Sequence, residues 1–135
     1  MISLSINYKV KMPLIFGGFL KKISKVTSTK LKVKKEMDVS LVFVGEMRMK
    51  KLNAIYRGQD EVTDVLSFGE VNEIVICFKQ AKRQATSSDT SIKQEVGFLF
   101  SHGLLHLLGY THNTGSKYKK MIGLQEDILK KSLKS

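Results

Sequence analysis

The sequence predicts an α+β fold in a single domain, residues 1–135: a small mixed sheet of about four strands packed by helices. Four short apolar or alternating segments, at residues 2–6, 39–44, 65–68 and 74–78, are typical of strands. Segments with helical spacing separate and follow them. The segment 92–108 is apolar on nearly all sides, which predicts a central, buried helix around which the rest packs.

The N-terminal part of the chain predicts a strand and then a helix. Ile2, Leu4 and Ile6 alternate with polar residues, as in a half-buried strand. A proline opens the next segment, residues 13–27, and proline is favoured in the first turn of a helix. The basic segment 30–35 is expected to be exposed. The apolar side of the helix would consist of Leu14, Phe19, Leu20, Ile23 and Val26.

The middle of the chain predicts a helix between strands. Residues 47–56 follow the second strand with helical spacing. The strands at 65–68 and 74–78 are joined by a connection short enough for a hairpin. The candidate core positions of the helix are Met49, Leu52, Ile55 and Tyr56.

The C-terminal part predicts three helices. Residues 79–85 form a short one, and the turn cluster 86–91 is rich in N-cap residues that precede the long central helix. A last amphipathic helix spans about residues 117–129, and the lysine-rich tail is expected to be frayed.

Composition indicates a polyanionic partner. The chain has 23 Lys and Arg against 12 Asp and Glu, a formal net charge of +11. This balance favours nucleic acid, or less often an anionic membrane surface. The single cysteine, Cys77, excludes an intrachain disulfide and fits a reducing, cytoplasmic location. No apolar run approaches the roughly 20 residues of a membrane span, and the N-terminus does not read as a signal peptide.

All three histidines of the chain, His102, His106 and His112, lie close together in the sequence. The first two are four residues apart on the predicted central helix, so both imidazoles project from one face. Gly109 allows the chain to leave the helix and bring His112 back as a third ligand. Three imidazoles with one open position are the usual arrangement of a catalytic zinc site.

Two other interpretations of the histidines stay open. They are ordinary helix residues with satisfied hydrogen bonds, or they form a structural zinc site. A structural site needs a fourth protein ligand, and because Cys77 lies far away in an apolar run, that ligand would be Asp or Glu.

Arg57 and the segment beginning at Thr63 and Asp64 are a second group of interest. The guanidinium fork of arginine is a natural ligand for phosphate. The alternative is a surface arginine paired with Asp60 or Glu61. Thr63 and Asp64 are more typical of a cap at the entry to a strand than of a catalytic pair.

These residues resemble the YbeY family of bacterial endoribonucleases. The string from His102 to His112 looks like the family's histidine signature, and the resemblance covers most of residues 39–129. The other matching pieces, in order, are Asn53-x-x-Tyr56-Arg57, Thr63-Asp64-Val65-Leu66-Ser67-Phe68, Glu95 and Leu124-Gln125-Glu126-Asp127-Ile128-Leu129.

The resemblance implies a zinc-dependent, single-strand-specific endoribonuclease with a zincin-like metal helix. The family acts in 3′-end maturation of small-subunit ribosomal RNA and in ribosome quality control. Carried over by position, His102, His106 and His112 would bind one zinc ion per chain, and Arg57 would act in RNA cleavage. The implied partners are ribosomal RNA and the ribosome or a pre-ribosomal particle, and no membrane. Two routes of cleavage stay open, with water or the RNA 2′-hydroxyl as nucleophile.

The chain departs from the family pattern at a few positions. Thr111 stands at a usual aspartate position, Gly69 stands where proline is typical, and the connection between Phe68 and Ile74 is short. A zinc protease would need a glutamate where Gly103 stands, which argues against peptide hydrolysis. The alternative to an enzyme is a non-catalytic ribosome- or RNA-binding factor whose zinc only stabilises the fold.

Overall fold

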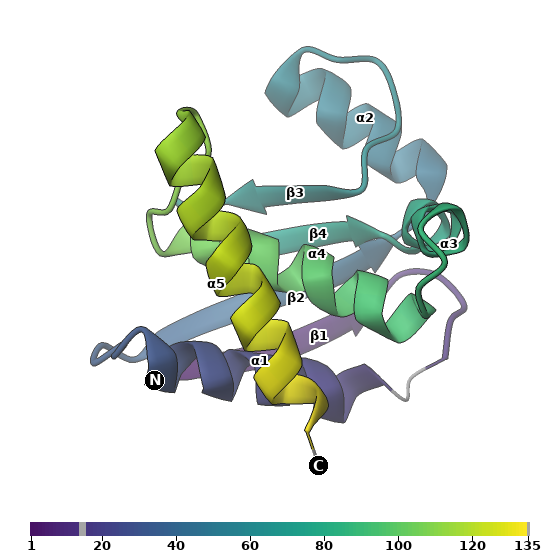
Figure 1. Cartoon of the computed structure of the whole chain (residues 1–135). Coiled ribbons are helices and arrows are strands. Elements are labelled where there is room, and N and C mark those ends of the chain that lie inside the picture. Colours follow the sequence, from purple (N-terminus) through teal and green to yellow (C-terminus); the bar gives the residue numbers. More distant parts are fainter. Residues whose placement is uncertain (14–15, 135) are drawn as a thin grey trace.

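The computed structural model describes residues 1–13 and 16–134, and it has the α+β architecture that the sequence predicts (Figure 1). Its strands and helices alternate along the first half of the chain, and three helices complete the second half. In chain order they are β1 (Ile2–Tyr8), α1 (Gly17–Lys30), β2 (Met37–Val44), α2 (Glu46–Arg57), β3 (Val65–Phe68), β4 (Glu73–Cys77), α3 (Phe78–Ser87), α4 (Ile92–Leu107) and α5 (Gly115–Leu133).

The four strands form one mixed sheet in the order β1-β2-β4-β3. Strands β1, β2 and β4 are parallel, whereas β3 pairs antiparallel with β4 as the predicted hairpin. The hairpin turn places Asn72 at a φ of 50°, a left-handed conformation that asparagine tolerates. This topology puts β3 at one edge of the sheet.

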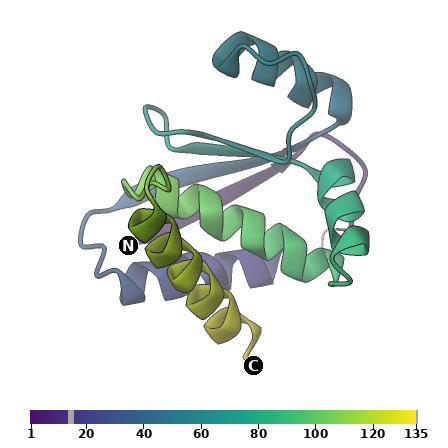
Figure 2. The same cartoon turned by 45° about the horizontal axis from the view of Figure 1, so that its top comes forward.

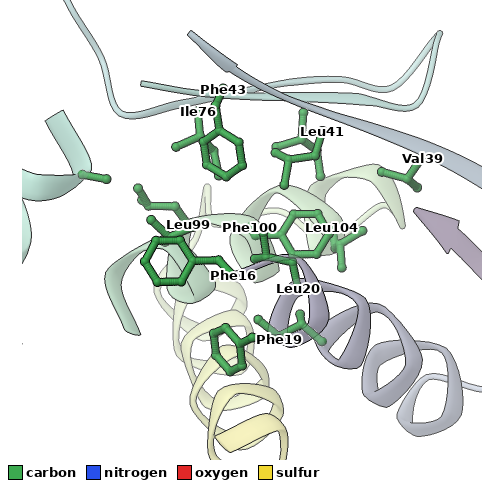
Figure 3. Close-up of a cluster of buried hydrophobic side chains, with 14 of the residues drawn as sticks. Phe16, Phe19, Leu20, Val39, Leu41, Phe43, Ile76, Leu99, Phe100 and Leu104 are labelled. Atoms are coloured by element: carbon green, nitrogen blue, oxygen red, sulfur yellow. The ribbon is translucent and has the colours of Figure 1, made fainter. Parts of the chain in front are cut away.

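The two faces of the sheet bury different residues because side chains alternate along each strand. Leu41, Phe43, Ile74 and Ile76 belong to the main core, and α1, α4 and α5 lie on that side (Figures 1 and 2). Figure 3 shows Leu41, Phe43 and Ile76 facing the side chains of α4 and α1. A smaller cluster on the opposite face lies under α2, and its buried members are Val44, Met49, Leu66, Val75 and Cys77.

Helix α4 is the central helix, as predicted. Ser91 caps its start by accepting a hydrogen bond from the Gln94 amide at 3.0 Å. The helix lies very close to the sheet at Gly103, where a Cβ atom would come within 2.9 Å of Ile74 Cγ2. Glycine at this position therefore permits the tight packing that fixes α4 on the sheet.

Several sequence-based expectations need correction. The first helix begins at Gly17 rather than at residue 13, and Leu14 lies outside the described residues. Ile55 and Tyr56 are not core residues, since they are 63% and 56% exposed. Helix α2 covers the sheet with one face only, which buries Met49 and Asn53 and turns the other side to solvent.

The last helix is longer than predicted at both ends. Thr114 caps its N-terminus by accepting from the Lys117 amide at 3.2 Å. Near the other end Ser132 is buried and donates to the Ile128 carbonyl at 2.7 Å, so the helix continues to Leu133 where we expected fraying. Cys77 is buried, and burial raises the pKa of its thiol. In the described part of the chain, no helix has the length and apolarity needed to cross a membrane.

Candidate metal centre

The three histidines meet at the C-terminal end of α4. His102 and His106 lie on its last two turns, and His112 lies in the loop before α5. Each ring offers one nitrogen, and these three nitrogens lie within 4.8 Å of one another. The Nε2 atoms of His102 and His106 are 3.0 Å apart. Two nitrogens on a tetrahedral zinc ion are separated by about 3.3 Å at ordinary bond lengths, so small ring movements would fit the group to a metal.

A local turn brings His112 back to the helix. The Tyr110 amide donates to the Leu105 carbonyl at 2.9 Å, and the Gly109 amide donates to the His106 carbonyl at 3.0 Å. These two bonds form a Schellman motif, in which the residue after the cap adopts a left-handed conformation. Gly109 holds that position with a φ of +94°. The role predicted for Gly109 is therefore confirmed, and its cause is backbone geometry.

The environment keeps two of the rings neutral. Burial lowers the pKa of His102, and the nearby His112 lowers it further. Burial also lowers the pKa of His106, as do the two other histidines and Arg57. A neutral imidazole has the free lone pair that a metal ion needs.

Gln125 of α5 lies beside the His102 ring. The Gln125 side chain is fully buried, and its interaction with the imidazole raises the pKa of His102, against the effect of burial. The Gln125 Oε1 atom is buried without a hydrogen-bond partner, so it is free to accept an N–H from the far side of the His102 ring. The Tyr110 carbonyl lies beside the His106 ring and acts on its pKa in the same direction. Metal-binding histidines usually donate their second N–H in this way, so the donor set fits a metal ion with both Nε2 atoms turned inward.

We therefore expect Gln125→Leu to weaken metal binding. The substitution preserves the approximate volume but removes the acceptor, and loss of such a partner costs about 10- to 100-fold in metal affinity. Competition with a zinc-sensitive dye measures the change. Gln125→Glu keeps an acceptor and should bind metal within a few-fold of the unaltered protein. Equal affinity for Gln125→Leu and the unaltered protein would contradict the assigned role.

A cavity of about 480 Å³ opens beside the histidines. Arg57, the last residue of α2, lines it together with all three histidines, so the structure brings together every site residue that the sequence singled out. Its Nη2 donates to the Ser67 carbonyl at 3.0 Å. Within residues 1–13 and 16–134, neither Asp60 nor Glu61 forms an ion pair with this arginine. The guanidinium is exposed and therefore available to an anion.

Asp64 is a site residue that the sequence analysis assigned only to capping. Its Oδ1 does accept from the Val65 amide, at 2.7 Å, but its side chain also lines the cavity. The Gln84 amide group donates to Asp64 Oδ2 at 3.2 Å and to Glu95 Oε2 at 2.9 Å. Glu95 therefore supports Asp64 through Gln84 and lies outside the group of possible metal ligands. Residue spacing along the sequence does not predict that Gln84 links these two carboxylates.

The geometry also explains why the site is not that of a zinc protease. The position after the first histidine, Gly103, faces Ile74 at a distance that leaves no room for a side chain. A glutamate base could not occupy it without moving α4 off the sheet.

The fold and the site together define a metal-dependent hydrolase whose cavity suits an anionic substrate. Comparison with known proteins makes this specific: the family model described as Endoribonuclease YbeY matches residues 9–133. The chain belongs to the YbeY endoribonuclease family. It is accordingly a metal-dependent enzyme that hydrolyses RNA.

Relatives resemble the chain over most of its length. Endoribonuclease YbeY of Phytoplasma australiense is 41% identical over 111 residues, which cover 73% of this chain and 77% of that protein. The Ureaplasma urealyticum protein of the same name is 40% identical over 116 residues, covering 79% and 75%. The solution structure of TM1509 from Thermotoga maritima superposes with a TM-score of 0.69 at 26% identity, covering 96% of this chain and 89% of that one.

Proposed function

We propose that the chain is a single catalytic domain in which His102, His106 and His112 bind one zinc ion and Arg57 serves the cleavage of single-stranded RNA. In this proposal it acts in the cytoplasm on ribosomal RNA, in 3′-end maturation of the small-subunit RNA and in ribosome quality control. The observation that carries the proposal is that Arg57 lines the same cavity as the three histidines.

The residues around the cavity have complementary roles in cleavage of a phosphodiester. The three imidazoles would hold the metal ion, which when bound would supply a Lewis acid and lower the pKa of a water molecule to roughly 7. Arg57 binds the phosphate and offsets the charge that gathers on its free oxygens. Asp64 accepts a proton from the attacking hydroxyl group. Among the described residues that line the cavity, it is the one carboxylate.

The ribosomal partner is supported by charge. A net charge of +11 on 135 residues attracts RNA over long range and suits a ribosome or pre-ribosomal particle as the source of the substrate. The cavity itself contributes only one permanent cation, Arg57, among its lining residues. Long-range attraction and local phosphate binding are therefore separate parts of the proposal.

Cleavage of a labelled RNA by the zinc-loaded protein tests the proposed function. We expect cuts in a single-stranded RNA and none in the same sequence held as a duplex. A 2′,3′-cyclic phosphate at the new ends would identify the 2′-hydroxyl as nucleophile, whereas a 5′-phosphate with a free 3′-hydroxyl would indicate attack by water. Absence of cleavage in every zinc-loaded sample would overturn the proposal.

The same assay tests Asp64. Asp64→Asn keeps the oxygen that accepts from the Val65 amide and loses only the bond from Gln84, so the fold should be nearly unchanged. We expect kcat to fall by at least about 100-fold with little change in KM, the usual effect of losing a general base. Full activity of Asp64→Asn would exclude proton transfer by this carboxylate.

A further inference from the structure

A second cavity, of about 550 Å³, adjoins the metal cavity. Arg57, Ser67 and Gly69 line both, so the two are continuous at the end of α2. The remaining wall of the second cavity consists of Leu52, Tyr56, Phe68, Glu70, Val71 and Glu73.

An aromatic pair, the exposed Tyr56 and the half-buried Phe68, forms one side of this cavity. Tyr56 packs edge-on against Phe68, with ring centroids 5.1 Å apart and an interplanar angle of 72°. The Arg57 guanidinium carbon lies 5.7 Å from the centre of the Phe68 ring. Tyr56 nevertheless remains 56% exposed. Aromatic faces beside a phosphate-binding arginine are typical of sites that stack the bases of single-stranded nucleic acid.

The charges that line the second cavity indicate where the base and the phosphate of a bound RNA would lie. Glu70 and Glu73 line the second cavity, and Arg57 is the one cation among the described residues of its wall. Two carboxylates repel phosphate but accept hydrogen bonds from the amino groups of bases. The RNA backbone therefore belongs on the Arg57 side, and an adjoining base belongs over Tyr56.

We propose that Tyr56, Phe68 and Val71 form a subsite for the nucleobase next to the phosphate that is cut. This inference rests on the proposed function, because Arg57 orients the strand only if the metal cavity takes the phosphate. The subsite fixes the register of the strand: stacking on Tyr56 places the neighbouring phosphate at Arg57. It also favours single strands, since a base held in a duplex cannot leave its stack to enter the cavity.

A single tryptophan detects the stacking directly, because the chain contains no tryptophan. Tyr56→Trp places one on the subsite. Tyr118→Trp is the matched control, at a tyrosine that is 54% exposed and lines neither cavity. The probe is a single-stranded oligoribonucleotide of about ten residues, beside an abasic oligomer with the same phosphates. We expect the base-containing RNA to quench Tyr56→Trp emission, the abasic oligomer to leave it unchanged, and Tyr118→Trp to respond to neither.

Cleavage kinetics give a second, independent measurement. Tyr56→Ala should raise KM about tenfold with kcat nearly unchanged, since stacking of one base contributes about 1–3 kcal/mol. Tyr56→Phe keeps the ring and should restore KM, and Tyr118→Ala should leave both constants unaltered.

The outcomes separate the two proposals. Equal quenching by the abasic oligomer, or an unchanged KM for Tyr56→Ala in a protein that cleaves RNA, overturns the subsite alone. Absence of RNA cleavage by the zinc-loaded unaltered protein overturns the proposed function. Quenching of Tyr56→Trp by a protein partner and not by RNA would assign the cavity to that partner and contradict our inference.

Discussion

Replacing His106 with alanine is expected to remove bound metal and RNA cleavage together. The ring contributes one of three nitrogens that lie within 4.8 Å of one another, and two imidazoles do not form a tight zinc site. Without the metal, the Lewis acid is lost, and we expect the rate to fall by at least about 1,000-fold. Elemental analysis of the purified protein gives the metal content, and the RNA assay gives the rate.

A control on the same helix makes this result specific. Lys93→Ala changes an exposed residue at the other end of α4 and should keep both metal and activity. RNA binding by His106→Ala should mostly survive, because the positive charge of the surface is unaltered. A folded, metal-free His106→Ala protein that still cleaves RNA would exclude a catalytic metal.

Replacing Arg57 with alanine is expected to slow cleavage by about 100- to 1,000-fold, the usual cost of losing a group that stabilises charge in the transition state. The melting temperature should stay almost constant, because the exposed guanidinium donates to the carbonyls of Tyr56 and Ser67 and lies beside the Phe68 ring at the surface, and none of these contacts belongs to the core. Arg57→Lys should recover part of the activity, since lysine restores the charge but not the two-pronged geometry. Rates and thermal melts on the same preparations test these expectations.

Arg48→Ala is the matched control for Arg57. Arg48 is also an exposed arginine of α2, but it lines neither cavity. Its removal should alter the rate little. A large loss of stability in Arg57→Ala, with activity retained, would mean that Arg57 is a structural residue and would remove it from the mechanism.

The features that could be predicted from the sequence depend on local spacing. Alternation in the first strand and short apolar runs in the other three predicted the sheet, and the four-residue spacing of His102 and His106 predicted a shared face of α4. The return of His112 followed from Gly109, whose left-handed conformation ends the helix. These are properties of short segments, so they can be predicted without knowledge of the fold.

The features that could not be predicted depend on contacts between distant segments. Gln125 reaches His102 from another helix, and Gln84 links Asp64 to Glu95 across three elements. The prediction that Tyr56 is a core residue was wrong, because helical spacing does not show how much of α2 the sheet covers. Its exposure places an aromatic face beside Arg57, which is the basis of the subsite that we propose.

Zinc titration into the metal-free protein, with RNA cleavage as the readout, tests whether the three histidines hold a catalytic metal ion. We expect no cleavage without metal, a rate that rises with added zinc, and saturation at one zinc ion per chain. Cleavage at full rate by the metal-free protein, or no cleavage after one zinc ion per chain has bound, would contradict this expectation.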